Sequence, residues 1–258
     1  MSIPTGRLRQ SFEQRRISLI VPALNEQDVI ESTVRGIVSQ VHDRFAEYEI
    51  ILVDDGSTDK TGTIMDQLAA GTHSIRVLRN VTNLGLGVCY KRGIKEAKYE
   101  YVMMLCGDGG LPAASLPPIF DAIGTADIVI PHMLNLRAIK TRFRYALSRT
   151  YTTLLNVWFG QTLQYYNGLP VHRLDLLRQI DIVSSGFGFQ GEILVKLLKA
   201  GCSYVEVGVL GAENTHRSSA VSLKNLAKVV KTLSHLTSSV LVSLESQGRS
   251  ITRNFPEK

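Results

Sequence analysis

The sequence has few cysteines, and their spacing indicates neither a disulfide framework nor a zinc site. Only three occur among 258 residues, Cys89, Cys106 and Cys202, and no two of them form a CxxC pair. An odd number of unpaired cysteines fits a reducing compartment and argues against stabilising cross-links. We therefore expect a cytoplasmic protein.

Long apolar runs are also missing. No stretch of 18 or more apolar residues occurs, and the first 16 residues are polar and basic rather than signal-like. A bilayer-spanning helix needs about 20 such residues. We therefore expect a protein that is soluble or peripheral to a membrane, possessing a flexible basic arm over residues 1–16.

Excess negative charge is absent, because 29 basic residues outnumber 23 acidic ones and give a net charge of +6. This balance favours anionic partners such as nucleotides or phospholipids. Nucleic acid is a third kind of anionic partner, but it is the least supported, since the charge is modest and no basic-aromatic repeat is evident. The 44% hydrophobic content supplies a sizeable core, which excludes global disorder.

The most informative stretch is residues 49–59, Glu-Ile-Ile-Leu-Val-Asp-Asp-Gly-Ser-Thr-Asp. Four consecutive apolar residues predict a strand buried on both faces. This strand delivers Asp54 and Asp55 to its carboxyl end, where open α/β sheets bind ligands. In isolation, a polar turn followed by a helix cap explains the same residues equally well.

Further short strands alternate with helical segments at a spacing of about 25 residues, which predicts an α/β fold with a mostly parallel sheet. We expect these strands at residues 17–21, 75–78, 101–105 and 126–130. Glu26 and Asp108 follow two of them, so they should meet Asp54 and Asp55 at one edge. We expect Asn25 to cap the first helix.

Glycines precede a basic helix start at Asn83-Leu84-Gly85-Leu86-Gly87. Such glycines allow close approach of the backbone to a ligand. Together with Lys91 on the following helix, Gly85 is a candidate for binding phosphate.

Residues 132–160 are rich in basic and aromatic side chains at helical spacing. A basic amphipathic helix is typical of a membrane surface or of an anionic ligand site. A helix packed on the core with solvated arginines explains the pattern equally well. A second amphipathic helix is expected over residues 222–258, with packing, membrane contact or homo-oligomer formation as alternatives.

Glu192 begins a helix after the aromatic-glycine segment 187–191. A carboxylate at a helix start can serve only the helix dipole. Its place beside an expected cleft makes it a candidate catalytic residue, and the strand expected at 204–209 follows this helix.

Taken together, five motifs resemble the family 2 glycosyltransferases of GT-A fold, and within them the polyprenyl-phosphate glycosyltransferases such as dolichol-phosphate mannose synthase. They are Ile-Ser-Leu-Ile-Val-Pro-Ala-Leu-Asn-Glu, Ile-Leu-Val-Asp-Asp-Gly-Ser-Thr-Asp, Asn-Leu-Gly-Leu-Gly, Gly-Asp-Gly and Asn-Gly-Leu-Pro-Val-His-Arg. The resemblance covers about residues 17–235, and we place the glycosyltransferase domain at 17–221.

The resemblance implies roles for individual residues. The nucleotide of a sugar donor would be bound by Pro22, Ala23, Glu26, Asp54, Gly85, Lys91 and Gly107. Asp108 would hold a divalent cation, Mg²⁺ or Mn²⁺, on the donor diphosphate. Transfer would invert the configuration at the sugar carbon that is attacked. A lipid-phosphate acceptor is already anionic, whereas a hydroxyl acceptor needs a base, for which Glu192 is the candidate.

Two positions depart from the family pattern. The first aspartate of a DxD motif would stand at position 106, which is Cys106 here. The family's Arg and Gly-x-Ser-Lys pattern before the last helices is replaced by His216-Arg217-Ser218-Ser219. Arg217 is nevertheless a candidate catalytic residue, whose role would be to bind a phosphate group.

Three functions remain open from the sequence. The first is sugar transfer from a nucleotide donor to a polyprenyl phosphate at the cytoplasmic face of the membrane. The second is a soluble glycosyltransferase that acts on a saccharide or other hydroxyl. The third is a nucleotide-sugar-binding protein without catalysis, which Cys106 makes credible.

Overall fold

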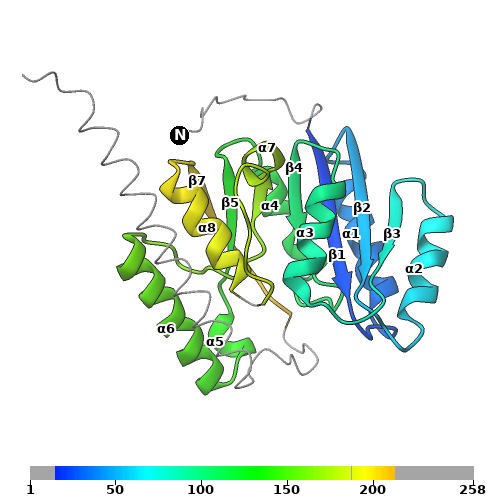
Figure 1. Ribbon diagram of the computed structural model, residues 1–258, viewed down its shortest axis with the longest axis horizontal. Helices are drawn as coiled ribbons and strands as arrows, with labels where there is room; N and C mark the ends of the chain where they lie inside the picture. Colours follow the sequence, from blue (N-terminus) through cyan, green and yellow to red (C-terminus); the bar gives the residue numbers. More distant parts are fainter. Residues whose placement is uncertain (1–14, 187, 213–258) are drawn as a thin grey trace, which may run out of the picture.

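A seven-stranded sheet covered by helices on both faces forms the centre of the molecule (Figure 1). The computed structural model describes residues 15–186 and 188–212. The strands are β1 (Arg16–Ala23), β2 (Glu47–Asp54), β3 (Ile75–Arg79), β4 (Tyr101–Met104), β5 (Ile128–Met133), β6 (Val171–Arg173) and β7 (Tyr204–Val209).

The strand order is β3-β2-β1-β4-β6-β5-β7, and only β6 runs antiparallel to its neighbours. The mostly parallel α/β sheet expected from the sequence is thus confirmed. Because β6 reverses direction between β4 and β5, those two strands point the same way. Their carboxyl ends therefore lie at the same edge as those of β1 and β2.

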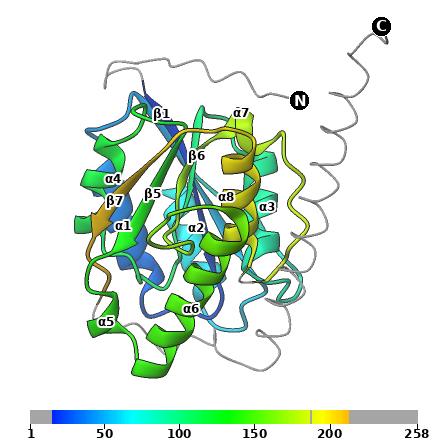
Figure 2. The same ribbon diagram turned by 90° about the vertical axis from the view of Figure 1, so that its left-hand side faces the viewer.

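Helices divide between the two faces of the sheet (Figure 2). One face is covered by α1 (Ile30–Val41), α2 (Thr61–Ala70) and α4 (Pro117–Asp121), with the 3₁₀ helix η2 (Ala113–Ser115) before α4. The other face packs against α3 (Leu86–Glu96), α6 (Arg142–Phe159), α7 (Leu174–Leu177) and α8 (Phe189–Lys199). The short helix α5 (Leu136–Ile139) follows β5.

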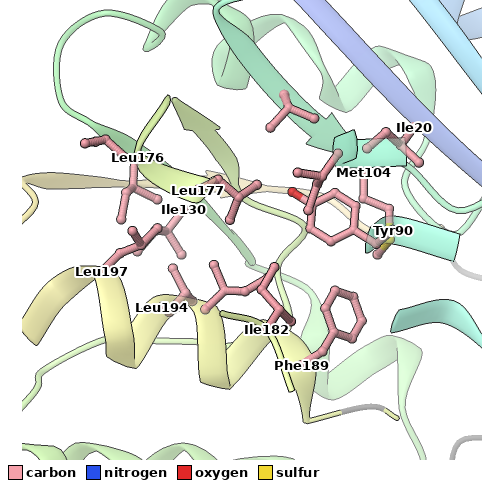
Figure 3. Packing of buried hydrophobic residues seen from close by; sticks show 14 of the residues in the cluster. Ile20, Tyr90, Met104, Ile130, Leu176, Leu177, Ile182, Phe189, Leu194 and Leu197 are labelled. Atoms are coloured by element: carbon pink, nitrogen blue, oxygen red, sulfur yellow. The ribbon is translucent and has the colours of Figure 1, made fainter. Parts of the chain in front are cut away.

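The core consists of two layers, because successive strand residues point to opposite faces. On β1, Leu19 belongs to the layer under α1, whereas Ile20 belongs to the layer under α3. A Cβ on Gly93 of α3 would lie 2.5 Å from Ile20, so this glycine lets the helix approach the sheet. In the α8 layer, Leu194 and Leu197 face the strands (Figure 3).

The beginning of the chain differs from the expectation in two respects. β1 continues through Pro22 to Ala23 because it stays paired with β2, and its regular pairing with β4, on the side of the missing proline N–H, ends at Ile20 and Met104. Asn25 does not cap α1, which begins only at Ile30. It has a left-handed φ of 56° instead, and its Oδ1 accepts a hydrogen bond from Thr58 N at 2.8 Å. The predicted cap was therefore wrong.

Most of the predicted basic arm 1–16 and the whole of the helix 222–258 lie outside the described residues. Arg15 and Arg16 are described, and Arg16 begins β1. In the part of the chain that the structure describes, no helix has the length and apolar character needed to cross a membrane. The division into arm, domain and C-terminal helix stays a prediction.

A buried histidine makes the stability of the sheet dependent on pH. His172 on β6 is 2% exposed, its Nδ1 lies 3.3 Å from Tyr90 Oη, and its Nε2 has no partner among the described residues. Burial lowers the pKa of His172 from 6.5 to about 3. Between these values the unfolded chain binds a proton that the folded chain does not, so stability falls as pH falls.

We expect the free energy of unfolding to drop by about 2 kcal/mol more in the wild type than in His172→Leu between pH 7.5 and 5. Urea titrations at the two pH values measure this difference. An equal loss in both proteins would contradict the assignment.

Candidate functional site

The strand ends bring the predicted carboxylates together at one edge of the sheet. Ala23 O accepts from Asp55 N at 3.0 Å, and Pro22 O accepts from Gly107 N at 3.0 Å. The backbone of β1 thus ties the turns that follow β2 and β4. Pro22 and Ala23 are buried in this arrangement, so only a small part of each residue is accessible to a nucleotide.

Glu26 and Asp108 both lie close enough to Cys106 for their charges to act on its thiol. Burial raises the pKa of the Cys106 thiol first, and the charges of Asp108 and Glu26 raise it further. The thiol therefore stays protonated at neutral pH. Glu26 is half-buried, and its backbone N donates to Thr61 Oγ1 at 2.8 Å, which links the end of β1 to α2.

The two adjacent aspartates have different environments. Asp54 is buried, its Oδ1 accepts from Ser57 N at 2.9 Å, and its Oδ2 lies 3.7 Å from Arg79 Nε. A Cβ on Gly62 would lie 2.6 Å from Asp54 Oδ2, so the glycine leaves room for this carboxylate. Asp54 thus lies in a polar environment at the carboxyl end of β2, as a nucleotide contact requires.

Asp55 anchors the glycine loop before α3. Its Oδ1 accepts from Asn80 Nδ2 at 2.7 Å and from Leu84 N at 2.9 Å, and its Oδ2 accepts from Gly85 N at 2.9 Å. Gly85 has a φ of 92°, a conformation that side chains disfavour. This anchoring role was missed from the sequence, although Asn80 directly after β3 was the available signal.

Lys91 and Gly107 make structural contacts. Lys91 Nζ donates to Ile182 O at 3.2 Å, which joins α3 to the loop before α8. Gly107 is buried, and a Cβ there would lie 2.7 Å from Ala23 Cβ and 2.9 Å from Ile30 Cδ1. Glycine at this position therefore allows the turn after β4 to pack on β1. Their nucleotide-binding roles stay predictions.

Asp108 is the candidate metal ligand. It is half-buried, and its Oδ1 accepts from Gly110 N at 2.9 Å. No group of three His, Cys, Asp or Glu side chains in the described residues is arranged to hold a metal ion. A single carboxylate fits a hard divalent ion whose remaining ligands are diphosphate oxygens and water. The Cys106 thiol does not replace the missing carboxylate, because Mg²⁺ and Mn²⁺ prefer oxygen ligands to sulfur.

Glu192 is fully buried on α8, and both of its carboxylate oxygens accept hydrogen bonds. Its Oε1 accepts from Lys196 Nζ at 2.6 Å and from Val183 N at 3.0 Å, and its Oε2 accepts from Ser184 N at 2.8 Å. Burial by itself raises the pKa of Glu192, but these hydrogen bonds outweigh it and lower the pKa. The geometry therefore does not support the general base considered from the sequence. Arg217 lies outside the described residues.

A basic pocket of about 130 Å³ lies where β5, α5 and α6 meet. Arg137, Arg149, Tyr145, Tyr165 and His132 are among the side chains that line it. His132 Nδ1 is buried and has no partner among the described residues. These side chains lie up to 33 positions apart in the sequence, which is why sequence reasoning did not assemble the pocket.

Two further contacts fix the side chains of this pocket. Lys140 Nζ donates to Tyr165 Oη at 3.0 Å and lies 5.1 Å from the centre of the Tyr165 ring. Arg149 Nη1 donates to Gln164 O at 3.4 Å. The pocket is therefore a preformed concentration of positive charge at the same sheet edge as Asp108.

The sheet order and the carboxylates at its edge are those expected of a GT-A fold, and the comparisons show the family. The sequence model of glycosyl transferase family 2 matches residues 18–174. This match spans more than half of the chain, so the protein belongs to glycosyl transferase family 2. It is a glycosyltransferase.

Two curated relatives align along most of their length. The undecaprenyl-phosphate mannosyltransferase of Micrococcus luteus is 29% identical over 220 residues, which cover 80% of this chain and 88% of the relative. The polyprenol monophosphomannose synthase of Mycolicibacterium smegmatis is 27% identical over 250 residues, which cover 89% and 92%.

Solved structures share the fold. Glucosyl-3-phosphoglycerate synthase from Mycobacterium tuberculosis, in complex with Mg²⁺ and uridine diphosphate, superposes with a TM-score of 0.65 at 21% identity. The alignment covers 86% of this chain and 79% of that one. The GT-A fold expected from the sequence motifs is confirmed.

Proposed function

We propose that this glycosyltransferase moves a sugar from a nucleotide-diphosphate donor to the phosphate of a polyprenyl phosphate, with inversion, at the cytoplasmic face of the membrane. The observation that carries the proposal is the basic pocket at the same sheet edge as Asp108. A donor site and a phosphate site side by side are what such a transfer requires. The names of the two curated relatives support the same acceptor class.

The chemistry of the pocket fits a phosphate monoester. The guanidinium groups of Arg137 and Arg149 bind phosphate through paired, charge-assisted hydrogen bonds. His132 Nδ1 lies at the same site as a buried polar atom for which the described residues offer no partner. Tyr165, whose hydroxyl binds Lys140, adds a further polar edge.

The bonding of Glu192 favours a phosphate acceptor over a hydroxyl. In the transfer, an acceptor phosphate oxygen forms a bond to the anomeric carbon while the bond from that carbon to the donor diphosphate breaks. A phosphate is already ionised at pH 7 and loses no proton, so no base is required. The engagement of Glu192 is compatible with this reaction, whereas the saccharide alternative would need another base.

Donor binding would use the carboxylates at the ends of β1, β2 and β4. Asp54 and Glu26 accept hydrogen bonds from base and ribose in this proposal, because carboxylates are acceptors. Asp108 would hold the divalent cation, Mg²⁺ or Mn²⁺, whose charge offsets that of the departing nucleoside diphosphate.

The outer face of α6 supports peripheral contact with a membrane. Phe143, Leu147, Leu154 and Trp158 fall on one side of this helix and are 36–69% exposed. On another side of the helix, Leu155 and Phe159 are buried in the core. Arginines flank the exposed apolar stripe, which is the pattern of a helix that lies in an anionic lipid interface.

We expect Phe143→Ser combined with Trp158→Ser to reduce co-sedimentation with phosphatidylglycerol-containing liposomes by about tenfold or more. The control is Val81→Ser, which removes a fully exposed apolar side chain from the loop after β3. Equal sedimentation of the double variant and the control would show that α6 is not the membrane contact.

The acceptor assignment is tested by Arg149→Ala. We expect the KM for a short-chain polyprenyl phosphate to rise about tenfold to a hundredfold, because a charge-assisted contact is lost. Hydrolysis of the nucleotide sugar without acceptor should remain unchanged. The assay first screens UDP-, GDP- and dTDP-sugars with Mg²⁺ or Mn²⁺. Transfer to saccharides but to no lipid phosphate would overturn the proposed function.

A further inference from the structure

The segment after β7, residues 210–212, lies between the basic pocket and the turn that carries Asp108. On one side, Asn135 binds Gly211 through both atoms of its side-chain amide. On the other side, Ala212 N donates to Gly110 O at 3.2 Å. The segment therefore connects two parts of the site that are far apart in the sequence.

Asn135 makes a two-point contact with the backbone. Its Oδ1 accepts from Gly211 N at 2.9 Å, and its Nδ2 donates to Gly211 O at 2.8 Å. Asn135 stands at the N-cap position of α5, yet its side chain makes no capping hydrogen bond there. Asparagine commonly caps helices, so here its side chain is committed to Gly211 instead.

Gly211 is tightly enclosed at this contact. A Cβ built on it would lie 2.7 Å from Ile139 Cδ1 and 3.1 Å from Met133 Sδ. The segment is thus pressed against α5 and the end of β5. Leu134 and Leu136, the chain neighbours of Asn135, line the basic pocket.

The contact continues to the candidate metal ligand. Ala212, the residue after Gly211, donates to Gly110 O, and Gly110 N donates to Asp108 Oδ1 at 2.9 Å. Each step is a hydrogen bond or a covalent neighbour. A displacement of the segment would therefore change the geometry of the Asp108 carboxylate.

We infer that Asn135 is a positioning residue that fixes Asp108 relative to the acceptor pocket, through Gly211, Ala212 and Gly110. The inference rests on the proposed function for the identity of the two sites that it aligns. Asn135 touches neither substrate in this scheme. Its role is to hold the donor-side carboxylate at a set distance from the acceptor phosphate.

Hydrogen exchange of the substrate-free protein tests the mechanical part of the inference. In Asn135→Ala we expect the peptide that contains Gly110 to exchange between about twofold and tenfold faster, because its tie to the 210–212 segment is loosened. The matched control is Ser203→Ala, which removes a side-chain hydrogen bond to Asp127 at the opposite end of β7. That control should leave exchange at Gly110 unchanged.

Kinetics test the functional part. Asn135→Ala should lower kcat about tenfold to a hundredfold while changing the KM for donor and acceptor by less than about threefold, because reacting groups are misaligned rather than unbound. In an Asp108→Asn background the same change should have little further effect, since Asn135 acts through Asp108. Additive losses in the double variant would overturn the inference.

The outcomes separate this inference from the proposed function. Faster exchange at Gly110, without transfer to any lipid phosphate, supports the positioning contact and contradicts the acceptor assignment. Unchanged exchange at Gly110 in a folded Asn135→Ala protein overturns the inference whatever the acceptor is. If Asn135→Ala does not fold, Asn135→Ser keeps a hydroxyl acceptor for Gly211 N, and it should show a smaller change in the same direction.

Discussion

Replacement of Asp108 by asparagine is expected to lower the rate of sugar transfer by about a hundredfold to a thousandfold. The amide oxygen of asparagine can still accept from Gly110 N, so the turn after β4 keeps its hydrogen bond. What is lost is the negative charge that would hold a divalent cation on the departing diphosphate. Loss of such electrostatic stabilisation has effects of this size.

The measurement is kcat for transfer at saturating Mg²⁺ and Mn²⁺, together with the metal concentration that gives half-maximal rate. Cys106→Asp is the informative companion, because it restores the first aspartate of the family's DxD motif, two residues before Asp108. We expect it to lower the half-maximal metal concentration. Wild-type rates in Asp108→Asn would remove Asp108 from the catalytic centre.

Replacement of Glu192 by alanine is expected to destabilise the protein by about 3–5 kcal/mol, which corresponds to roughly 10 °C in Tm. The side chain is 1% exposed, and its removal takes the acceptor from two backbone N–H groups and leaves the ammonium of Lys196 with only Asp181 O. The loss of a largely buried ion pair together with two backbone hydrogen bonds accounts for the size of the effect. Thermal and urea unfolding measure it.

The same helical spacing supplies a matched control. Arg35 and Glu31 form an i,i+4 ion pair like Lys196 and Glu192, but their side chains are 69% and 54% exposed. Glu31→Ala should change stability by less than about 0.5 kcal/mol. Equal effects of Glu31→Ala and Glu192→Ala would refute the structural role of Glu192.

The meeting of the carboxylates at one sheet edge was predictable because its signals are local. Each buried strand is an apolar run that ends directly in polar residues, so Glu26, Asp54 and Asp108 could be placed at one edge from the parallel order alone. The fold and the family followed from the same motifs. The exact starts of helices were harder, as Asn25 shows, since its side chain binds Thr58 rather than the helix.

The remaining parts of the site depend on contacts that no local pattern encodes. Asp54 and Asp55 are adjacent aspartates that the sequence does not distinguish. Only the positions of Asn80 and Gly85 show that Asp55 anchors the glycine loop. Glu192 begins a helix as a catalytic base might, but Lys196 and the preceding loop engage it fully. Such roles are set by three-dimensional partners.

The three-residue strand β6 joins two halves of the sheet that are built from different parts of the chain. All proposed donor contacts in the described residues come from the first 110 positions, which build the sheet half β3-β2-β1-β4. The basic pocket comes from residues 132–165, which belong to the half β5-β7 and its helices. Within the sheet, β6 alone joins the two halves. If the proposed function holds, changes in the half that carries the basic pocket would alter the acceptor and leave the proposed donor contacts in place.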